Sequence, residues 1–218
     1  GADASHGDVK RPTIRHLPCF QPSCRLRVAL ICRGLIALCV IGGVHAGAAA
    51  DDTALLRELR SGAVLLMRHT QTTAGVGDPP AWRLERCESQ RNLDASGVAH
   101  AKRIGQWFAS HQLRVTVVRN SPWCRARDTA MLAFGRHDDW APLSNIFEDR
   151  SGADAQATAV RQYVHSLPPG ELVVLVSHGV TISHLVGGAG LATGESVVVR
   201  AGASPAAPLQ VIGRLVVP

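Results

Sequence analysis

Histidine and arginine side chains follow three apolar segments of this sequence, each where the segment ends. Arginine binds planar oxyanions through two parallel hydrogen bonds and stays charged at any working pH. An imidazole can attack phosphorus or, when protonated, donate a hydrogen bond to the same oxygens. Several cations around one nucleophile suit phosphoryl transfer without a metal ion or other cofactor, because that reaction depends mostly on positioning and charge stabilisation. The residues concerned are Arg68 and His69 after segment 62–67, Arg125 just beyond segment 115–120, and His178 after segment 171–177.

The apolar segments themselves predict the strands that position these side chains. Segments 62–67 and 171–177 are nearly continuous in apolar residues, which is typical of strands covered on both faces. Helical periodicity separates the strands, and Asp94 is placed to cap a helix that runs to about residue 110. The further expected helices are 125–134 and 153–167, and the further expected strands are 115–120, 195–200 and 209–217, the last two as a hairpin or edge pair.

This alternation of strands and helices predicts an α/β fold, namely a three-layer α/β/α sandwich with a mostly parallel sheet. Ligands of such sheets bind beyond the carboxyl ends of the strands. We therefore expect one pocket to gather the polar residues at these ends, which are Arg68, His69, Arg125 and His178.

Composition and charge distribution limit the classes of function. The chain has 218 residues, of which 46% are hydrophobic, and this is enough for one well-packed domain. The formal net charge is +6, but residues 1–50 hold six of the 23 Lys and Arg residues against two Asp, leaving 17 basic and 15 acidic residues in 51–218. A nearly balanced domain with only 4% aromatic residues argues against a nucleic-acid-binding surface.

Residues 1–50 have the layout of a secretory signal peptide behind an N-terminal extension. The apolar run 34–44 follows basic residues that include Arg33 and precedes small residues. A membrane anchor is the alternative, but spanning needs about 20 apolar residues and would draw Arg33 into the hydrocarbon. We expect an exported, periplasmic domain over 51–218 whose contact with the membrane ends at cleavage. The candidate cleavage sites end at Ala46, Ala48 and Ala50.

The six cysteines divide in the same way. Four belong to the leader, so the mature chain keeps Cys87 and Cys124. An oxidising compartment permits a disulfide between them, which the sequence leaves open because it does not show their geometry. The sequence contains neither a C-x-x-C pair nor a Cys and His cluster with zinc spacing, so no metal site is expected.

Three motifs, each at an expected strand end, resemble in type and order those of the histidine phosphatase superfamily, which has the phosphoglycerate mutase-like fold. They read LLMRHTQTT (65–73), RNSPWCRARDTA (119–130) and VLVSHGVTISHLVG (174–187), and the similarity extends over nearly all of 60–200. The resemblance implies that His69 is the nucleophile that becomes phosphohistidine. It also implies phosphate binding by neighbouring side chains, which are Arg68, Thr72, Arg125 and His178.

Departures from the family pattern refine this expectation. Thr70 stands where the family usually has Gly, and Gly75 stands where the mutases tend to have Asn, which disfavours a mutase. The family's proton donor is commonly an acidic residue between the second and third motifs. Glu148 and Asp149 are the candidates, and we take Glu148 as the candidate general acid. The layout is most similar to exported bacterial members such as lipopolysaccharide core heptose phosphate phosphatases.

The expected function is a metal-independent phosphomonoester hydrolase that acts through a phosphohistidine intermediate on a small phosphorylated substrate, such as a phospho-sugar of the cell envelope. Two alternatives stay open. One is a phosphohistidine-protein phosphatase, which needs no strong general acid. The other is a non-catalytic module that binds phosphorylated glycan in the same pocket.

Simpler roles also stay open for single residues. Arg125 has Asp128 as a candidate ion-pair partner on its own helix. Arg91 is a candidate for either substrate binding or a salt bridge. His178 is placed to cap a helix that starts near Gly179, which is compatible with phosphate binding because helix N-termini favour anions.

Overall fold

Helix α1 (Ala46–Ser61) opens the part of the chain that the structure describes. The computed structural model describes residues 46–188 and 190–218, which belong to one compact unit. The predicted signal peptide lies outside the described residues except for its end at 46–50, which forms the start of α1. Helical structure therefore begins before residue 51, the expected start of the domain.

Five strands form one sheet at the centre of this unit. The strand order is β2-β3-β1-β4-β5, so β1 and β3 are central and each has a neighbour on both sides. Their register pairs Arg68 at the end of β1 with Ser177 at the end of β3. The strands are β1 (Ala63–Arg68), β2 (Val117–Asn120), β3 (Leu172–Ser177), β4 (Ser196–Arg200) and β5 (Gln210–Leu215).

The sheet is mixed, which corrects the expectation of a mostly parallel one. Strands β1 and β2 each run parallel to β3, whereas β4 runs antiparallel to both β1 and β5. For β4 and β5, the physical reason lies in the connection between these two strands. A loop without a crossover helix joins β4 to β5, and parallel neighbours need such a crossover. The expectation of a terminal hairpin or edge pair is confirmed.

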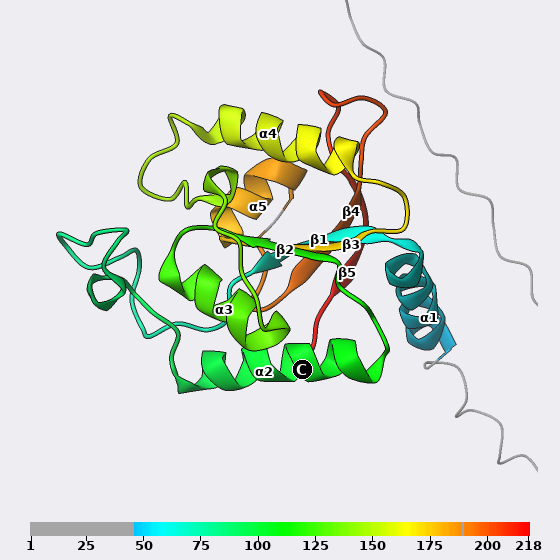
Figure 1. Cartoon of the computed structure of the whole chain (residues 1–218), viewed down its shortest axis with the longest axis horizontal. Coiled ribbons are helices and arrows are strands. Elements are labelled where there is room, and N and C mark those ends of the chain that lie inside the picture. Colours follow the sequence, from blue (N-terminus) through cyan, green and yellow to red (C-terminus); the bar gives the residue numbers. More distant parts are fainter. Residues whose placement is uncertain (1–45, 189) are drawn as a thin grey trace, which may run out of the picture. The chain divides into compact units, whose positions relative to one another are not determined.

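Helices cover both faces of the sheet (Figure 1). Helices α1, α2 (Ala95–Ser110) and α3 (Cys124–Phe134) lie on one face, and α4 (Ala153–Ser166) and α5 (Gly179–Val186) lie on the other. The predicted N-cap of α2 is confirmed, because the Asp94 side chain accepts a hydrogen bond from the amide of Gly97. Short 3-10 helices occur at Cys87–Ser89 and Ala141–Leu143.

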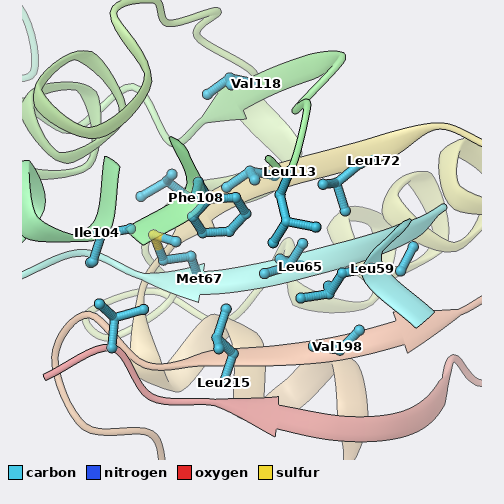
Figure 2. Packing of buried hydrophobic residues seen from close by; sticks show 14 of the residues in the cluster. Leu59, Leu65, Met67, Ile104, Phe108, Leu113, Val118, Leu172, Val198 and Leu215 are labelled. Atoms are coloured by element: carbon cyan, nitrogen blue, oxygen red, sulfur yellow. The ribbon is translucent and has the colours of Figure 1, made fainter. Parts of the chain in front are cut away.

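Two apolar clusters hold the helices against the sheet. Figure 2 shows the cluster on the α2 side, where Leu65 and Met67 of β1 meet Ile104 and Phe108 of α2. Alternate residues of β1, such as Leu66, point into the cluster on the α4 side. Strands β1 and β3 are thus buried on both faces, as the continuous apolar segments predict. Residues at the ends of these strands are consequently held on a rigid support.

Candidate active site

A cavity of about 560 Å³ opens at the carboxyl ends of the parallel strands. Arg68 is the last residue of β1 and His69 follows it, while His178 follows β3. Arg125 lies in the first turn of α3, shortly after β2 ends. All four side chains line this one cavity, so the structure brings together the strand-end residues that the sequence analysis grouped.

His69 presents one ring nitrogen to the cavity in a defined protonation state. Its Nδ1 atom lies 2.8 Å from the carbonyl oxygen of Thr70. A carbonyl oxygen only accepts, so Nδ1 carries the proton and Nε2 keeps its lone pair. Burial lowers the pKa of His69 to about 3, and the charges of Arg125 and Arg68 act in the same direction. The ring is therefore neutral at neutral pH, with Nε2 bonded to no described residue.

His178 lies against His69 on the wall of the cavity. The two rings pack edge to face with centroids 5.4 Å apart, and His178 Nε2 lies 2.7 Å from Ser121 Oγ. Burial lowers the pKa of His178 well below its usual value, and so do His69 in its protonated form and the charges of Arg125 and Arg68. His178 is the N-cap residue of α5, but its side chain makes no capping hydrogen bond. Its imidazole therefore lines the cavity and does not cap the helix.

Arg68 and Arg125 each bring an unpartnered donor to this region. The Nε atoms of both guanidinium groups are buried and have no hydrogen-bond partner within the described part of the chain. Arg68 is anchored by a hydrogen bond from Nη1 to the carbonyl of Leu191. Both arginines line the cavity, and a guanidinium group suits binding of an oxyanion because its charge strengthens its hydrogen bonds.

Arg125 forms a buried ion pair that the sequence analysis did not identify. Its Nη1 and Nη2 atoms lie 2.7 and 3.1 Å from Oδ1 and Oδ2 of Asp78, and both side chains are 1% exposed. The alternative pairing with Asp128 on the same helix is therefore wrong. Asp78 lies in the Gly- and Pro-rich segment 71–82, where no periodicity or motif marks a buried carboxylate.

Arg91 adds a third guanidinium to the cavity wall. Its side chain donates to the Thr72 hydroxyl at 2.7 Å and to the carbonyls of Gly75 and Gly77. It makes no side-chain salt bridge within residues 46–188 and 190–218, and substrate binding by Arg91 stays a prediction. Thr72, the predicted phosphate-binding hydroxyl, is buried behind Arg91 and does not line the cavity.

Glu148, the candidate general acid, lies outside this cavity. Its exposed carboxylate accepts a hydrogen bond from Trp82 Nε1 at 3.3 Å and lines an adjoining cavity of about 300 Å³. A Cβ atom on Gly77, which lines the larger cavity, would lie 3.5 Å from Glu148 Oε1. The carboxylate therefore lies next to Gly77, at the border of the cavity that contains His69. No Asp or Glu is among the described residues that line the larger cavity.

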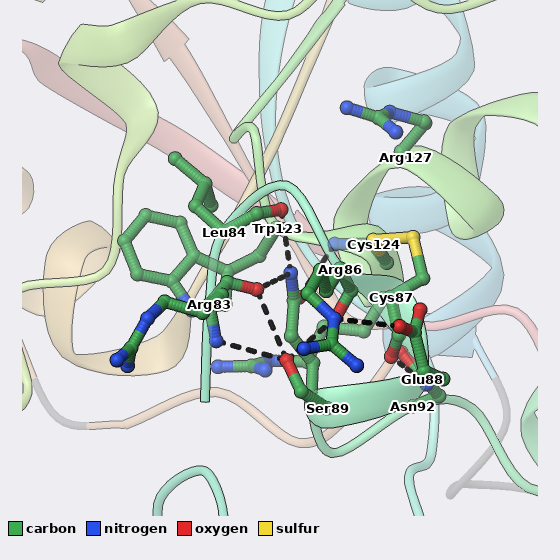
Figure 3. Close-up of a disulfide and its surroundings, with 12 residues drawn as sticks. Arg83, Leu84, Arg86, Cys87, Glu88, Ser89, Asn92, Trp123, Cys124 and Arg127 are labelled. Carbon is green, nitrogen blue, oxygen red and sulfur yellow. Dashed lines mark hydrogen bonds and ion pairs between the residues drawn. A yellow bond between two sulfur atoms is a disulfide. The ribbon is translucent and has the colours of Figure 1, made fainter. Parts of the chain in front are cut away.

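A disulfide joins the segment that follows β1 to the start of α3 (Figure 3). Cys87 and Cys124 are bonded with their Cα atoms 5.6 Å apart, which decides the pairing that the sequence left open. Gln90 reinforces the link, because its Oε1 accepts from the amide of Cys124 at 3.0 Å. Since Cys124 directly precedes Arg125, this disulfide anchors the loop that carries Asp78 and Arg91 to the helix that carries Arg125.

No group of three or more His, Cys, Asp or Glu side chains in the described ranges is placed to hold a metal ion. Among the same residues, none of the helices combines the length and the apolar character that crossing a bilayer requires.

Comparison with known proteins shows similarity of fold. No family model matches the sequence, and no curated protein sequence matches it. The protein histidine phosphatase SixA complexed with tungstate superposes with a TM-score of 0.50 at 14% identity, over 70% of this chain and 96% of that one. Bacillus stearothermophilus YhfR gives 0.49 at 17% identity, over 70% and 96%. The alpha-ribazole phosphatase from Shigella flexneri gives 0.46 at 16% identity, over 68% and 95%. The chain therefore has the fold of the first of these proteins.

Proposed function

We propose that this protein is a histidine phosphatase that hydrolyses a phosphorylated substrate through a phosphohistidine at His69. The observation that carries the proposal is the free Nε2 atom of His69 in a cavity that is also lined by Arg68, Arg125 and His178. A phosphoryl group placed there meets a neutral nucleophile and charged donors together. The fold shared with a protein histidine phosphatase supports the same function.

The proposed reaction has two steps. The lone pair of His69 Nε2 attacks phosphorus, the bond to the leaving oxygen breaks, and that oxygen takes a proton from Glu148 or from water. The proton stays on Nδ1, and its hydrogen bond to the Thr70 carbonyl oxygen stabilises the positive charge that the ring gains when Nε2 is phosphorylated. Water then attacks phosphorus, the P–N bond breaks, and inorganic phosphate leaves while His69 returns to its neutral form.

The proposed substrate is small and lies in the compartment to which the protein is exported. The signal-peptide layout of 1–50 supports export, and the disulfide between Cys87 and Cys124 suits an oxidising compartment such as the periplasm. A phospho-sugar of the cell envelope remains the proposed substrate, in line with the sequence resemblance to lipopolysaccharide core heptose phosphate phosphatases.

A phosphatase assay with His69→Asn tests the proposal. Wild-type protein should release phosphate from p-nitrophenyl phosphate, form an acid-labile phosphoenzyme and keep its activity in EDTA. The variant should lose turnover by about 1,000-fold or more, because it lacks the His69 Nε2 atom that attacks phosphorus and then carries the phosphoryl group. Wild-type protein that binds phosphate without turnover would instead be a phosphoglycan-binding module. An active variant or an EDTA-sensitive enzyme would refute the mechanism.

A phosphoramidate such as phosphohistidine is the second candidate substrate. The specific observation in its favour is that no described Asp or Glu lines the cavity with His69. A protonated imidazole leaves readily, whereas an alkoxide needs a proton from a general acid. Glu148→Gln separates the two substrates. A large loss with an alkyl phosphate favours the ester and assigns the acid, whereas equal activity with a clear preference for phosphohistidine favours the phosphoramidate.

A further inference from the structure

The carboxylate of Asp78 is fully occupied by hydrogen-bond donors inside the protein. Oδ1 accepts from Arg125 Nη1 at 2.7 Å and from the amide of Arg91 at 2.9 Å. Oδ2 accepts from Arg125 Nη2 at 3.1 Å and from Trp123 Nε1 at 3.0 Å. Although burial opposes ionisation, the hydrogen bonds from Arg125 hold the pKa of Asp78 below its usual value. Asp78 is therefore a fixed anion and has no proton to donate.

This contact uses one edge of the Arg125 guanidinium and leaves another open. Asp78 binds Nη1 and Nη2, whereas Nε is buried without a partner. The five N–H donors of arginine form a rigid planar fork, so holding one edge also sets the direction of the edge that carries Nε. Arg125 therefore has both an anchored side and a free donor.

Arg125 and Asp78 line different cavities. Arg125 lines the cavity that contains His69, whereas Asp78 lines the adjoining cavity together with Trp123. Asp78 is not among the described residues that line the cavity with His69, so its carboxylate leaves that space open. It places one negative charge beside Arg125 and Arg91.

We propose that Asp78 is a positioning residue that orients the free edge of the Arg125 guanidinium toward the phosphoryl group bound beside His69. This inference rests on the proposed function, because it assigns Asp78 a role at the same site. An arginine held in place before the substrate arrives loses little freedom when it binds, and a misplacement of about 1 Å can cost about 100-fold in rate.

The test compares Asp78→Asn with a matched variant, Asp139→Asn. Asp139 pairs with Arg127, two residues from Arg125 on the same helix, but that pair is about one-third exposed and lies outside the cavity. Binding of inorganic phosphate is measured by calorimetry, and kcat and KM are measured with p-nitrophenyl phosphate. We expect Asp78→Asn to weaken phosphate binding and to lower kcat/KM by about 100-fold. Asp139→Asn should match the wild type in both measurements.

A double-mutant cycle shows whether Asp78 acts through Arg125. Arg125→Lys removes the planar fork, so there is no edge left for Asp78 to orient. The combined variant with Asp78→Asn should therefore lose no more activity than Arg125→Lys alone, whereas independent roles would make the losses multiply. Multiplied losses would overturn the proposal.

A measurement on the wild-type protein covers the case in which Asp78→Asn does not fold. The Trp123 indole proton is held by Asp78, so its hydrogen exchange reports whether the carboxylate stays in place. Exchange should stay slow when inorganic phosphate is added, because phosphate binds the other edge of Arg125. Faster exchange with phosphate, or tighter phosphate binding by Asp78→Asn, would show that Asp78 occupies the phosphate's place and would overturn the proposal. These binding readouts stand even if His69→Asn shows that the protein is not a phosphatase.

Discussion

The Nδ1 atom of His69 donates a hydrogen bond to the carbonyl of Thr70, and the amide of Thr70 in turn donates to Thr129 Oγ1 at 3.1 Å. Thr129 then donates to the carbonyl of Arg125 at 2.7 Å. A short chain of hydrogen bonds thus connects His69 to the helix that carries Arg125. Thr70 takes part in this connection through its buried side chain as well.

The low pKa of His69 makes stability depend on pH. The unfolded chain binds a proton at this residue near pH 6.5, whereas the folded protein does so only near pH 3, so stability falls as pH drops through this window. Between pH 8 and pH 5 the loss due to His69 is about 2 kcal/mol. Urea unfolding of wild type and His69→Asn at both pH values measures it. The variant should lose less stability on acidification, and an identical loss in both proteins would contradict the prediction.

Thr129→Val breaks the connection between His69 and α3. The substitution leaves the buried amide of Thr70 without its acceptor, which costs about 1–3 kcal/mol. We also expect lower turnover, because Thr70 holds the His69 ring. Thr158→Val is the matched control, since Thr158 makes the same bond to the preceding turn of its helix but is exposed on α4. Equal unfolding free energies for the two variants would contradict the prediction.

The disulfide stabilises the fold and the loop beside the cavity. Cys87 and Cys124 are 37 residues apart, and closing a loop of that length stabilises the protein by about 3–4 kcal/mol. The double variant with Ser at both positions should show that loss in urea unfolding. Reduction of the wild type should produce the same loss without any substitution. A variant as stable as the oxidised wild type would show that the hydrogen bond of Gln90 and the ion pair of Asp78 hold the loop alone.

Gly105 allows α2 and α3 to pack closely. A Cβ atom there would lie 2.2 Å from the carbonyl oxygen of Ala133, so Gly105→Ala must push the helices apart. Alanine usually favours a helix over glycine by about 1 kcal/mol, but we expect this variant to lose about 1–3 kcal/mol. A Cβ atom on Gly152 would have no atom within 4 Å. The unfolding free energy of Gly152→Ala should therefore stay within about 0.5 kcal/mol of the wild-type value. Thermal and urea unfolding of both variants measure whether each substitution lowers or raises the free energy of unfolding.

The sequence predicted those features of the fold that depend on local patterns. Continuous apolar segments indicated β1 and β3, and Asp94 indicated the start of α2, because burial on both faces and helix capping leave marks within a few residues. The direction of β4 was not predicted. Strand propensity does not specify which neighbour a strand joins or in which direction it runs, and here β4 pairs antiparallel with both β1 and β5.

The features of the candidate site also divide into those that local sequence patterns predict and those that they do not. By itself, the sequence determined that Arg68, His69 and His178 stand at strand ends, because each follows a continuous apolar segment. Parallel strands bring such ends to one edge of the sheet. Only the tertiary structure decided that Asp78 binds Arg125 and that Glu148 lies outside the cavity. Asp78 and Arg125 are 47 residues apart, and their contact depends on the path of an irregular loop. That path is set by long-range contacts, among them the disulfide, and leaves no periodic pattern in the sequence.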